Sequence, residues 1–383
     1  MNSNQIIKRT LASALVSLGL LVMNVNAAES PAIHPPVSPV AAPSAASATQ
    51  GATSTPAPKP VPPLVHPRGV AVDGDGFVYV VDYVNAVVYK VTPQGQISVL
   101  ADGAGPGDKF LRPDSLTVDK AKNVYLADTA NSVVRKISPD GTVVTLAGRV
   151  THEQKIGVDG KGDLARFDIP TSIAVDSVGN LYVADNYSCV VRKVTPDGTV
   201  TTLAGKPGVP GSIDGKGAEV RFGKPRGVAV DEAGIVYVAD ESYHTIRKIA
   251  PDGSVTTLAG NPNYEAGDLD GVGTSAYFAA PRDLVVDARG NVYVADTDNH
   301  TIRKITPQGV VTTFAGAAGL SGYVDGKGAI ARFNMPRGIA VDKDGNLFVA
   351  DSENAAIRKI TPDGVVTTVM KTPTAAATPV KVP

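Results

Sequence analysis

One sequence pattern is repeated six times along this chain. Six units of similar sequence each begin at a proline, at Pro67, Pro113, Pro170, Pro225, Pro281 and Pro336. The spacings between these prolines are 46, 57, 55, 56 and 55 residues. A repeat of this length forms one supersecondary unit, which is stable only when neighbouring copies bury each other's apolar faces. The repeat therefore restricts the chain to an architecture of stacked copies.

Each unit contains four short segments with the composition of β-strands, separated by turn signals. In the sixth unit they are GIAVD (338–342), NLFVAD (346–351), AAIRKI (355–360) and VVTTV (365–369). Val, Ile, Tyr and Thr dominate these segments, as suits a packed sheet. A four-stranded unit recurring about every 40 to 57 residues is typical of a β-propeller blade. We predict an all-β fold, a six-bladed β-propeller over residues 66–371, closed by packing of blade six on blade one without an exchanged strand.

The repeat resembles that of the NHL family. The resemblance is carried by Pro-Arg-Gly-Ile-Ala-Val-Asp (336–342), Gly-Asn-Leu-Phe-Val-Ala-Asp (345–351) and the Asn299-His300 pair, which matches the letters that open the family name. It covers about 66–371 and implies four-stranded NHL blades. It implies no single function, because the family includes extracellular binding modules, RNA-binding adaptor domains, bacterial receptor sensor domains and a metal-dependent amidating lyase.

The two ends of the chain differ in composition from the repeats. Two basic residues precede the apolar run LASALVSLGLLVM, which is too short to span a membrane, and small residues suited to cleavage follow near Ala27. We predict a secretory signal peptide over 1–27, a disordered Pro/Ala/Ser-rich tether over 28–65 and a disordered tail over 372–383. A retained anchor helix is the alternative to the signal peptide. The protein is expected to be exported, periplasmic or secreted, monomeric and without stable membrane insertion after cleavage.

Charge and cysteine content limit the partners and the source of stability. The formal net charge is −1, which gives no reason to expect a nucleic acid partner. The single cysteine, Cys189, cannot form an internal disulfide. The apolar core alone must therefore hold the fold of an exported protein.

Carboxylates repeat with the blades. An aspartate ends the first strand of every unit and another ends the second: Asp73, Asp82, Asp119, Asp128, Asp176, Asp185, Asp231, Asp240, Asp287, Asp296, Asp342 and Asp351. Because a buried unpaired carboxylate is costly, we expect these twelve to accept turn amides or to pair with the Arg-Lys pairs of the third strands. Their sixfold repetition indicates a role in the scaffold.

Four links between blades carry the pattern Asp-Gly-x-Gly and end in a phenylalanine. The aspartates are Asp159, Asp214, Asp270 and Asp325, and the phenylalanines are Phe167, Phe222, Phe278 and Phe333. The phenylalanines are expected to fill space between blades. For the aspartates three interpretations stay open: a structural turn, a calcium site or a partner contact. Apart from this structural calcium no cofactor is expected. These loops also resemble those of large cell-surface adhesion proteins of the NHL family.

Residues that differ between the copies are the candidates for a specific function. In a propeller the loops between strands two and three lie on the same face as the links to the next blade, and we expect the long Asp-Gly-x-Gly insertions on that face as well. The loop residues predicted to contact a partner are Tyr83, Tyr187, Tyr243, His244 and His300. Tyrosine suits this role because it offers a large, stiff, amphipathic surface.

A second group of candidates follows the proline of each unit. These residues are Arg68, Asp114, Thr171, Arg226, Arg282 and Arg337. The four arginines are expected to ring the mouth of the central channel, where they either pair with acids such as Asp283 or attract an anionic ligand.

Two classes of function remain open at this stage. The first is a non-catalytic binding module that holds a protein, peptide or glycan on the loop-rich face and channel mouth. The alternative is a metal-dependent lactonase or lyase with its site at the central channel. A tri-histidine zinc site is poorly supported, since only His244 and His300 occupy equivalent positions. No catalytic residue is predicted, because no nucleophile elbow or phosphate loop occurs.

Overall fold

The computed structural model describes residues 60–105, 109–150 and 156–371. All of them belong to the compact unit Pro58–Pro383. The predicted signal peptide, the tether up to residue 59 and the predicted tail lie outside the described residues. Within the described ranges the chain forms 28 strands and seven short 3-10 helices. No helix in this part of the chain is long and apolar enough to cross a membrane.

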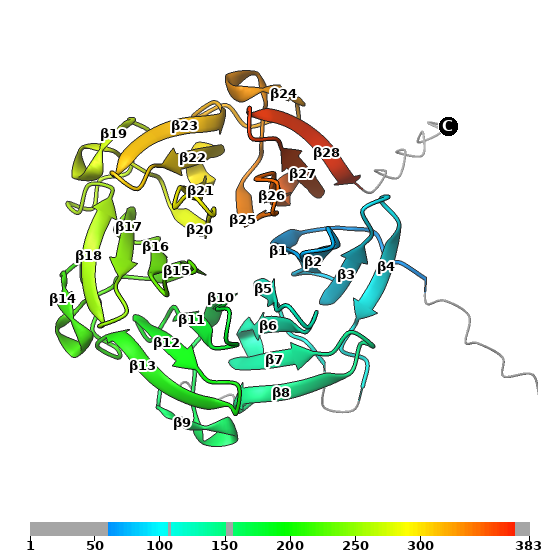
Figure 1. Ribbon diagram of the computed structural model, residues 1–383, viewed down its shortest axis with the longest axis vertical. Coiled ribbons are helices and arrows are strands. Elements are labelled where there is room, and N and C mark those ends of the chain that lie inside the picture. Colours follow the sequence, from blue (N-terminus) through cyan, green and yellow to red (C-terminus); the bar gives the residue numbers. More distant parts are fainter. Residues whose placement is uncertain (1–59, 106–108, 151–155, 372–383) are drawn as a thin grey trace, which may run out of the picture. The chain divides into compact units, whose positions relative to one another are not determined.

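The strands form six antiparallel sheets, which Figure 1 shows arranged around a central axis. The innermost strands are β1 (Pro67–Val72), β5 (Ser115–Val118), β10 (Pro170–Val175), β15 (Pro225–Val230), β20 (Pro281–Val286) and β25 (Pro336–Val341). The second strands are β2 (Val78–Asp82), β6 (Val124–Asp128), β11 (Leu181–Asp185), β16 (Val236–Asp240), β21 (Val292–Asp296) and β26 (Leu347–Asp351).

The outer half of each sheet continues the same order. The third strands are β3 (Val87–Val91), β7 (Val133–Ile137), β12 (Val190–Val194), β17 (Thr245–Ile249), β22 (Thr301–Ile305) and β27 (Ala356–Ile360). The fourth strands are β4 (Ile97–Ala101), β8 (Val143–Gly148), β13 (Thr199–Gly205), β18 (Ser254–Ala259), β23 (Val310–Gly316) and β28 (Val365–Lys371). The prediction of six blades, each starting near its proline, is confirmed.

The apolar core lies between blades. All five residues of each second strand are buried, because neighbouring blades cover both faces of the sheet. Between blades two and three, for example, Tyr125 and Ala127 pack with Ile173 and Val183. A blade separated from its neighbours would expose both apolar faces, so the blades are stable only as a ring.

Ring closure follows the prediction. No strand is exchanged between the first and last sheets. Val70 and Val80 of blade one instead share a buried cluster with Phe348 and Met370 of blade six. The Ser352 hydroxyl also donates a hydrogen bond of 2.6 Å to the Pro67 carbonyl oxygen.

The Asp-Gly-x-Gly insertions add a fifth strand to four blades. These two-residue strands are β9 (Gly160–Lys161), β14 (Gly215–Lys216), β19 (Gly271–Val272) and β24 (Gly326–Lys327). Each is followed by a 3-10 turn: η2 (Gly162–Leu164), η3 (Gly217–Glu219), η4 (Gly273–Ser275) or η6 (Gly328–Ile330). The three remaining 3-10 turns follow second strands: η1 (Thr129–Asn131), η5 (Thr297–Asn299) and η7 (Ser352–Asn354).

The position of these insertions corrects the sequence-based expectation. Lys161 pairs with Thr199 at the start of an outer strand, directly after the tight turn that joins strands three and four. The insertion therefore begins on the face of the second-to-third loops and runs along the outer edge of the blade toward the opposite face. Its Asp-Gly-x-Gly part does not decorate the loop face. The phenylalanine that follows returns inward, and Phe222, Phe278 and Phe333 are fully buried between blades as predicted.

Candidate functional site

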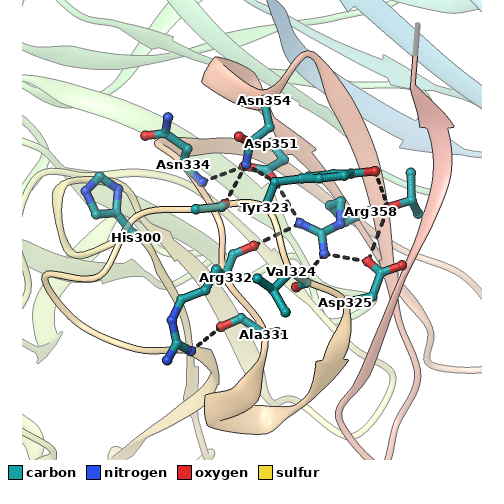
Figure 2. A network of polar contacts seen from close by, with 12 residues as sticks. His300, Tyr323, Val324, Asp325, Ala331, Arg332, Asn334, Asp351, Asn354 and Arg358 are labelled. Atoms are coloured by element: carbon teal, nitrogen blue, oxygen red, sulfur yellow. Dashed lines mark hydrogen bonds and ion pairs between the residues drawn. The ribbon is translucent and has the colours of Figure 1, made fainter. Parts of the chain in front are cut away.

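A buried arginine on the third strand connects the loop face to the outer edge of a blade. Figure 2 shows the network in blade six. The Arg358 guanidinium is fully buried and donates hydrogen bonds to Asp351 at 2.8 Å and Asp325 at 2.6 Å. It also donates to the carbonyl oxygens of Arg332 at 2.9 Å and Val324 at 2.8 Å. Arg358 thus has two carboxylate partners and two carbonyl partners.

The other Asp-Gly-x-Gly aspartates occupy the same place. Asp159 pairs with Arg192 at 2.7 Å, Asp270 pairs with Arg303 at 2.7 Å, and Asp214 pairs with Arg247. Outer-strand threonines also hydrogen-bond to them, as Thr313 does to Asp270 at 3.1 Å through its backbone N–H. Among the described residues no group of three or more His, Cys, Asp or Glu side chains is placed to share a metal ion. The observed role of these four carboxylates is that of a counter-ion for a buried arginine.

The twelve repeated aspartates have the partners that were expected. The first-strand aspartates bind turn amides: Asp342 accepts from the backbone N–H of Asp344 at 2.9 Å and of Asn346 at 2.8 Å. The second-strand aspartates are fully buried, and Asp296 accepts from the backbone N–H of Ala279 at 2.7 Å and from Arg303 at 2.9 Å. Burial raises the pKa of Asp296 to about 6, although Arg303 opposes that rise. These carboxylates hold the scaffold.

The two loop histidines join neighbouring blades. His244 and His300 have left-handed backbones, with φ of 55° and 57°. The His244 Nδ1 accepts a hydrogen bond of 3.1 Å from the backbone N–H of Ala280, and His300 Nδ1 accepts one of 3.1 Å from Met335. Burial lowers the pKa of His244, which favours the neutral ring that can accept this bond. Both histidines therefore have a structural role that the sequence did not reveal.

Exposed aromatic side chains gather on the loop face beside blades three to five. We call Tyr187, Lys224, Tyr243, His244 and Tyr264 the aromatic rim. The rings of Tyr243 and Tyr264 meet edge to face with centroids 5.2 Å apart, and His244 lies 6.1 Å from Tyr264. Lys224 Nζ lies 5.5 Å from the centre of the Tyr187 ring. Tyr187 is 52 % exposed and Tyr264 is 61 % exposed, so both can contact a partner.

The backbone beneath Tyr243 makes the aromatic rim continuous. A Cβ atom added at Gly223 would lie 2.4 Å from the Tyr243 ring, so the ring rests directly on the main chain next to Lys224. Three predicted contact residues, Tyr187, Tyr243 and His244, are thus brought together. Tyr264 was missed, because it stands in an insertion whose path could not be predicted.

The four predicted arginines do gather at one end of the channel. We call Arg68, Arg226, Arg282 and Arg337 the arginine ring; they line one pocket together with Asp114, Thr171 and Asp283. Tyr83, the remaining loop candidate, lies under the Arg68 guanidinium. The centre of the Tyr83 ring is 3.3 Å from the guanidinium carbon. Tyr83 therefore belongs to the channel mouth and not to the aromatic rim.

The counter-ions of the arginine ring differ from those expected. Asp114 bridges Arg68 at 3.0 Å and Arg226 at 2.7 Å, and the charge of these arginines lowers the pKa of Asp114 against the opposing effect of its burial. Arg282 pairs with Glu241 at 3.0 Å, and Arg337 lies 3.6 Å from Glu353. These three acids, and not Asp283, form the ion pairs.

Asp283 instead occupies the channel itself. It stands at the third position of its inner strand, where the other blades have glycine or serine: Gly69, Ser115, Ser172, Gly227 and Gly338. Its carboxyl accepts from the Ile339 backbone N–H at 3.2 Å and from the Ser172 hydroxyl at 3.3 Å. It lines both the mouth pocket and the channel cavity, which has a volume of about 160 Å³. Burial, with a further contribution from the Asp114 charge, raises the pKa of Asp283 to about 7.

Known proteins share this architecture. The profile of the NHL repeat matches residues 222–249 and 278–305, and that of the teneurin NHL domain matches 322–382. NHL repeat-containing protein 2 of Bos taurus is 32 % identical over 149 residues, which are 36 % of this chain and 20 % of that protein. The chain spans 8 to 20 % of the length of the first curated relatives it matches.

Two solved structures show the same fold at low identity. An auxiliary nutrient binding protein from Bacteroides thetaiotaomicron has a TM-score of 0.59 and 19 % identity, over 80 % of this chain and 70 % of that chain. A streptogramin B lyase has a TM-score of 0.54 and 14 % identity, over 82 % and 85 %. Fold and site together define a six-bladed β-propeller whose loop face carries the variable residues. The chain thus contains segments that match the NHL repeat, within a six-bladed propeller.

Proposed function

We propose that the protein is an exported, non-catalytic binding module that holds a protein, peptide or glycan partner on its loop face. The observation that carries this proposal is the aromatic rim, where Tyr187 and Tyr264 are more than half exposed on an otherwise well-packed scaffold. Tyrosine rings with a polar end and few rotatable bonds are favourable contact groups at interfaces. A solved propeller of the same fold described as an auxiliary nutrient binding protein is consistent with a binding role.

The test is a matched pair of variants. Tyr187→Ser with Tyr264→Ser removes the exposed rings of the aromatic rim and leaves the buried network intact. Val178→Ser removes an apolar side chain that is 73 % exposed in the tight turn between β10 and β11, on the opposite face. Purified proteins are screened on peptide and glycan arrays, and hits are measured by calorimetry.

We expect the tyrosine variant to lose at least about tenfold in affinity (about 1.4 kcal/mol) while its melting temperature stays unchanged. Val178→Ser is expected to bind as the parent protein does. If the tyrosine variant keeps full affinity for every hit, the binding face is wrong.

A metal-dependent lactonase or lyase is the second candidate, favoured by Asp283. A general acid or base works best when its pKa lies near the working pH, and burial places the pKa of Asp283 at about 7 beside four arginines. Elemental analysis of purified protein before and after chelation, with lactone and lyase substrate screens, tests this candidate. Turnover that is lost in Asp283→Asn would support an enzyme; turnover unaffected by that change would exclude this site.

A further inference from the structure

The arginine ring is divided into a neutralised side and a side with few partners. On the first side, Asp114 of blade two contacts Arg68 of blade one and Arg226 of blade four. On the same side, the Thr171 hydroxyl of blade three donates a hydrogen bond of 2.9 Å to the Arg226 carbonyl oxygen. The second side contains the adjacent blades five and six, whose arginines are Arg282 and Arg337.

Arg337 has fewer hydrogen-bond partners than the buried arginines of the third strands, such as Arg358. A guanidinium has five N–H donors in a fixed plane. Arg358 uses its donors on two carboxylates and two carbonyls, as Figure 2 shows. Arg337, by contrast, donates no hydrogen bond to any residue that the structure describes. Its sole ion pair there is to Glu353 at 3.6 Å.

The counter-ion of Arg337 is also shared and exposed. Glu353 is 43 % exposed and lies 3.1 Å from the Nε2 atom of His66. The Arg337 side chain is only 12 % exposed. A guanidinium removed from water next to a solvent-exposed, shared acid has unused capacity for an anion.

Neighbouring positive charges further favour an anion beside Arg337. Arg337 lies in the ring between Arg282 of blade five and Arg68 of blade one. Burial, followed by the charges of Arg282 and Arg68, lowers the pKa of Arg337 to about 10. Burial also lowers the pKa of Arg282, although Glu241 opposes that change. An anion placed between blades five, six and one would reduce the repulsion among these guanidinium groups.

We infer that the channel mouth is a carboxylate-binding site, with Arg337 and Arg282 as the groups that receive a ligand carboxylate. The inference rests on the proposed function, because it gives the partner on that same face a chemical group. A planar carboxylate matches the planar guanidinium fork, which can bind it through two parallel hydrogen bonds.

The size of the pocket favours a carboxylate over a larger oxyanion. The pocket among the ring side chains is partly open and has a volume of about 20 Å³. That volume holds about one water molecule. A carboxylate at the end of a slender chain needs to insert only its oxygens, whereas a tetrahedral phosphate is bulkier in every direction. At the wall of the pocket, the backbones of blades six and one are in contact, since a Cβ at Gly338 would lie 2.1 Å from the Arg68 carbonyl oxygen.

The probes are sodium acetate, its neutral analogue acetamide and inorganic phosphate, titrated into the full-length protein by calorimetry at constant ionic strength. Arg337→Gln and Arg282→Gln each remove one guanidinium. Arg289→Gln, in the exposed tight turn between β20 and β21, removes the same charge from the opposite face. Melting temperatures of all variants show whether they remain folded, and Arg337→Lys keeps the charge without the planar fork.

We expect acetate to bind more tightly than phosphate and acetamide not to bind. Each glutamine variant at the mouth should weaken acetate binding about tenfold or more, with Arg337→Lys intermediate and Arg289→Gln within about twofold of the parent. Acetate affinity unchanged in folded Arg337→Gln and Arg282→Gln, or tighter binding of phosphate, would overturn the inference.

Two further arms identify the source of the carboxylate and separate this inference from the proposed function. Triglycine with a free or an amidated carboxyl end is compared with glucuronate and glucose, so that a peptide end and an acidic sugar are distinguished. The Tyr187→Ser, Tyr264→Ser variant should still bind acetate. Acetate binding without any partner on the arrays would support the carboxylate site and refute the proposed binding module. A partner on the arrays without acetate binding would refute the carboxylate site alone.

Discussion

The carboxyl of Asp283 should make the stability of the ring depend on pH, and Asp283→Asn should remove that dependence. Asparagine keeps an oxygen that can accept from the Ile339 N–H but cannot ionise. In the unfolded chain an aspartate has an ordinary pKa, whereas burial raises the pKa of Asp283 from 3.8 to about 7 in the folded ring. Between these values the unfolded state is ionised and the folded state holds the proton.

The sign and size follow from this difference. Below about pH 4 both states are protonated and the substitution should change little. From about pH 4 to 7 the free energy of unfolding of the parent falls as pH rises, because the folded state binds more protons than the unfolded state. The full difference in pKa corresponds to about 4 kcal/mol. Because Asp283 is partly exposed to the channel cavity, we expect about half, roughly 2 kcal/mol, above pH 7.

Urea unfolding of parent and variant, in steps from pH 4 to pH 9, measures this difference directly. The curve of variant minus parent should rise from near zero at pH 4 to a plateau above pH 7, with Asp283→Asn the more stable protein there. Asp344→Asn, in the exposed tight turn of blade six, is the control and should give a flat curve. A flat curve for Asp283→Asn, or a variant less stable than the parent at pH 8.5, would refute the reasoning.

Three other predictions test the scaffold. Asp296→Ala should lower the free energy of unfolding by about 3–5 kcal/mol, because the fully buried Arg303 loses its fully buried counter-ion, whereas the exposed neighbour Asp298→Ala should change it by less than about 0.5 kcal/mol in the same urea assay. Gly338→Ala should destabilise the ring by about 1–3 kcal/mol or prevent its closure, since the new Cβ would lie 2.1 Å from a backbone oxygen of blade one; an unchanged urea midpoint would show that the junction can yield. Cys189 should react with a thiol reagent at pH 8 at least about a hundred times more slowly in the folded protein than in urea, because burial raises the pKa of its thiol to about 11, and equal rates in both states would contradict this.

Sequence alone specified the fold because each blade repeats the same local signals. The apolar second strands recur six times, and so do the turns in which Pro is followed by Asp or Gln and then Gly, so a single correct interpretation of one unit applied to all six. The fifth strand was not predictable in this way. Gly160 and Lys161 have no strand propensity, and they become a strand only because the outer edge of the next blade offers free backbone groups.

The candidate site was predicted in part. Arg68 and Arg337 gather at the channel mouth because they follow the proline of equivalent inner strands, and register alone places them there. That Asp114 reaches across blade three to Arg226 could not be seen, since it depends on the diameter of the closed ring. The role of His300 as a hydrogen-bond acceptor could not be predicted for the same reason, because its donor, the backbone N–H of Met335, lies at the start of the next blade.

The hydrogen bond between Ser352 and the Pro67 carbonyl has a consequence for how the chain could be reordered. Equivalent bonds join blade three to blade four, from Asn186 to the Pro225 oxygen, and blade five to blade six, from Thr297 to the Pro336 oxygen. The junction without a covalent link therefore uses the same contact as junctions that have one. A circular permutant that opens the chain before Pro225 and connects residue 371 to residue 60 would keep every blade and every junction. The folded ring therefore does not require the chain to start at one particular blade.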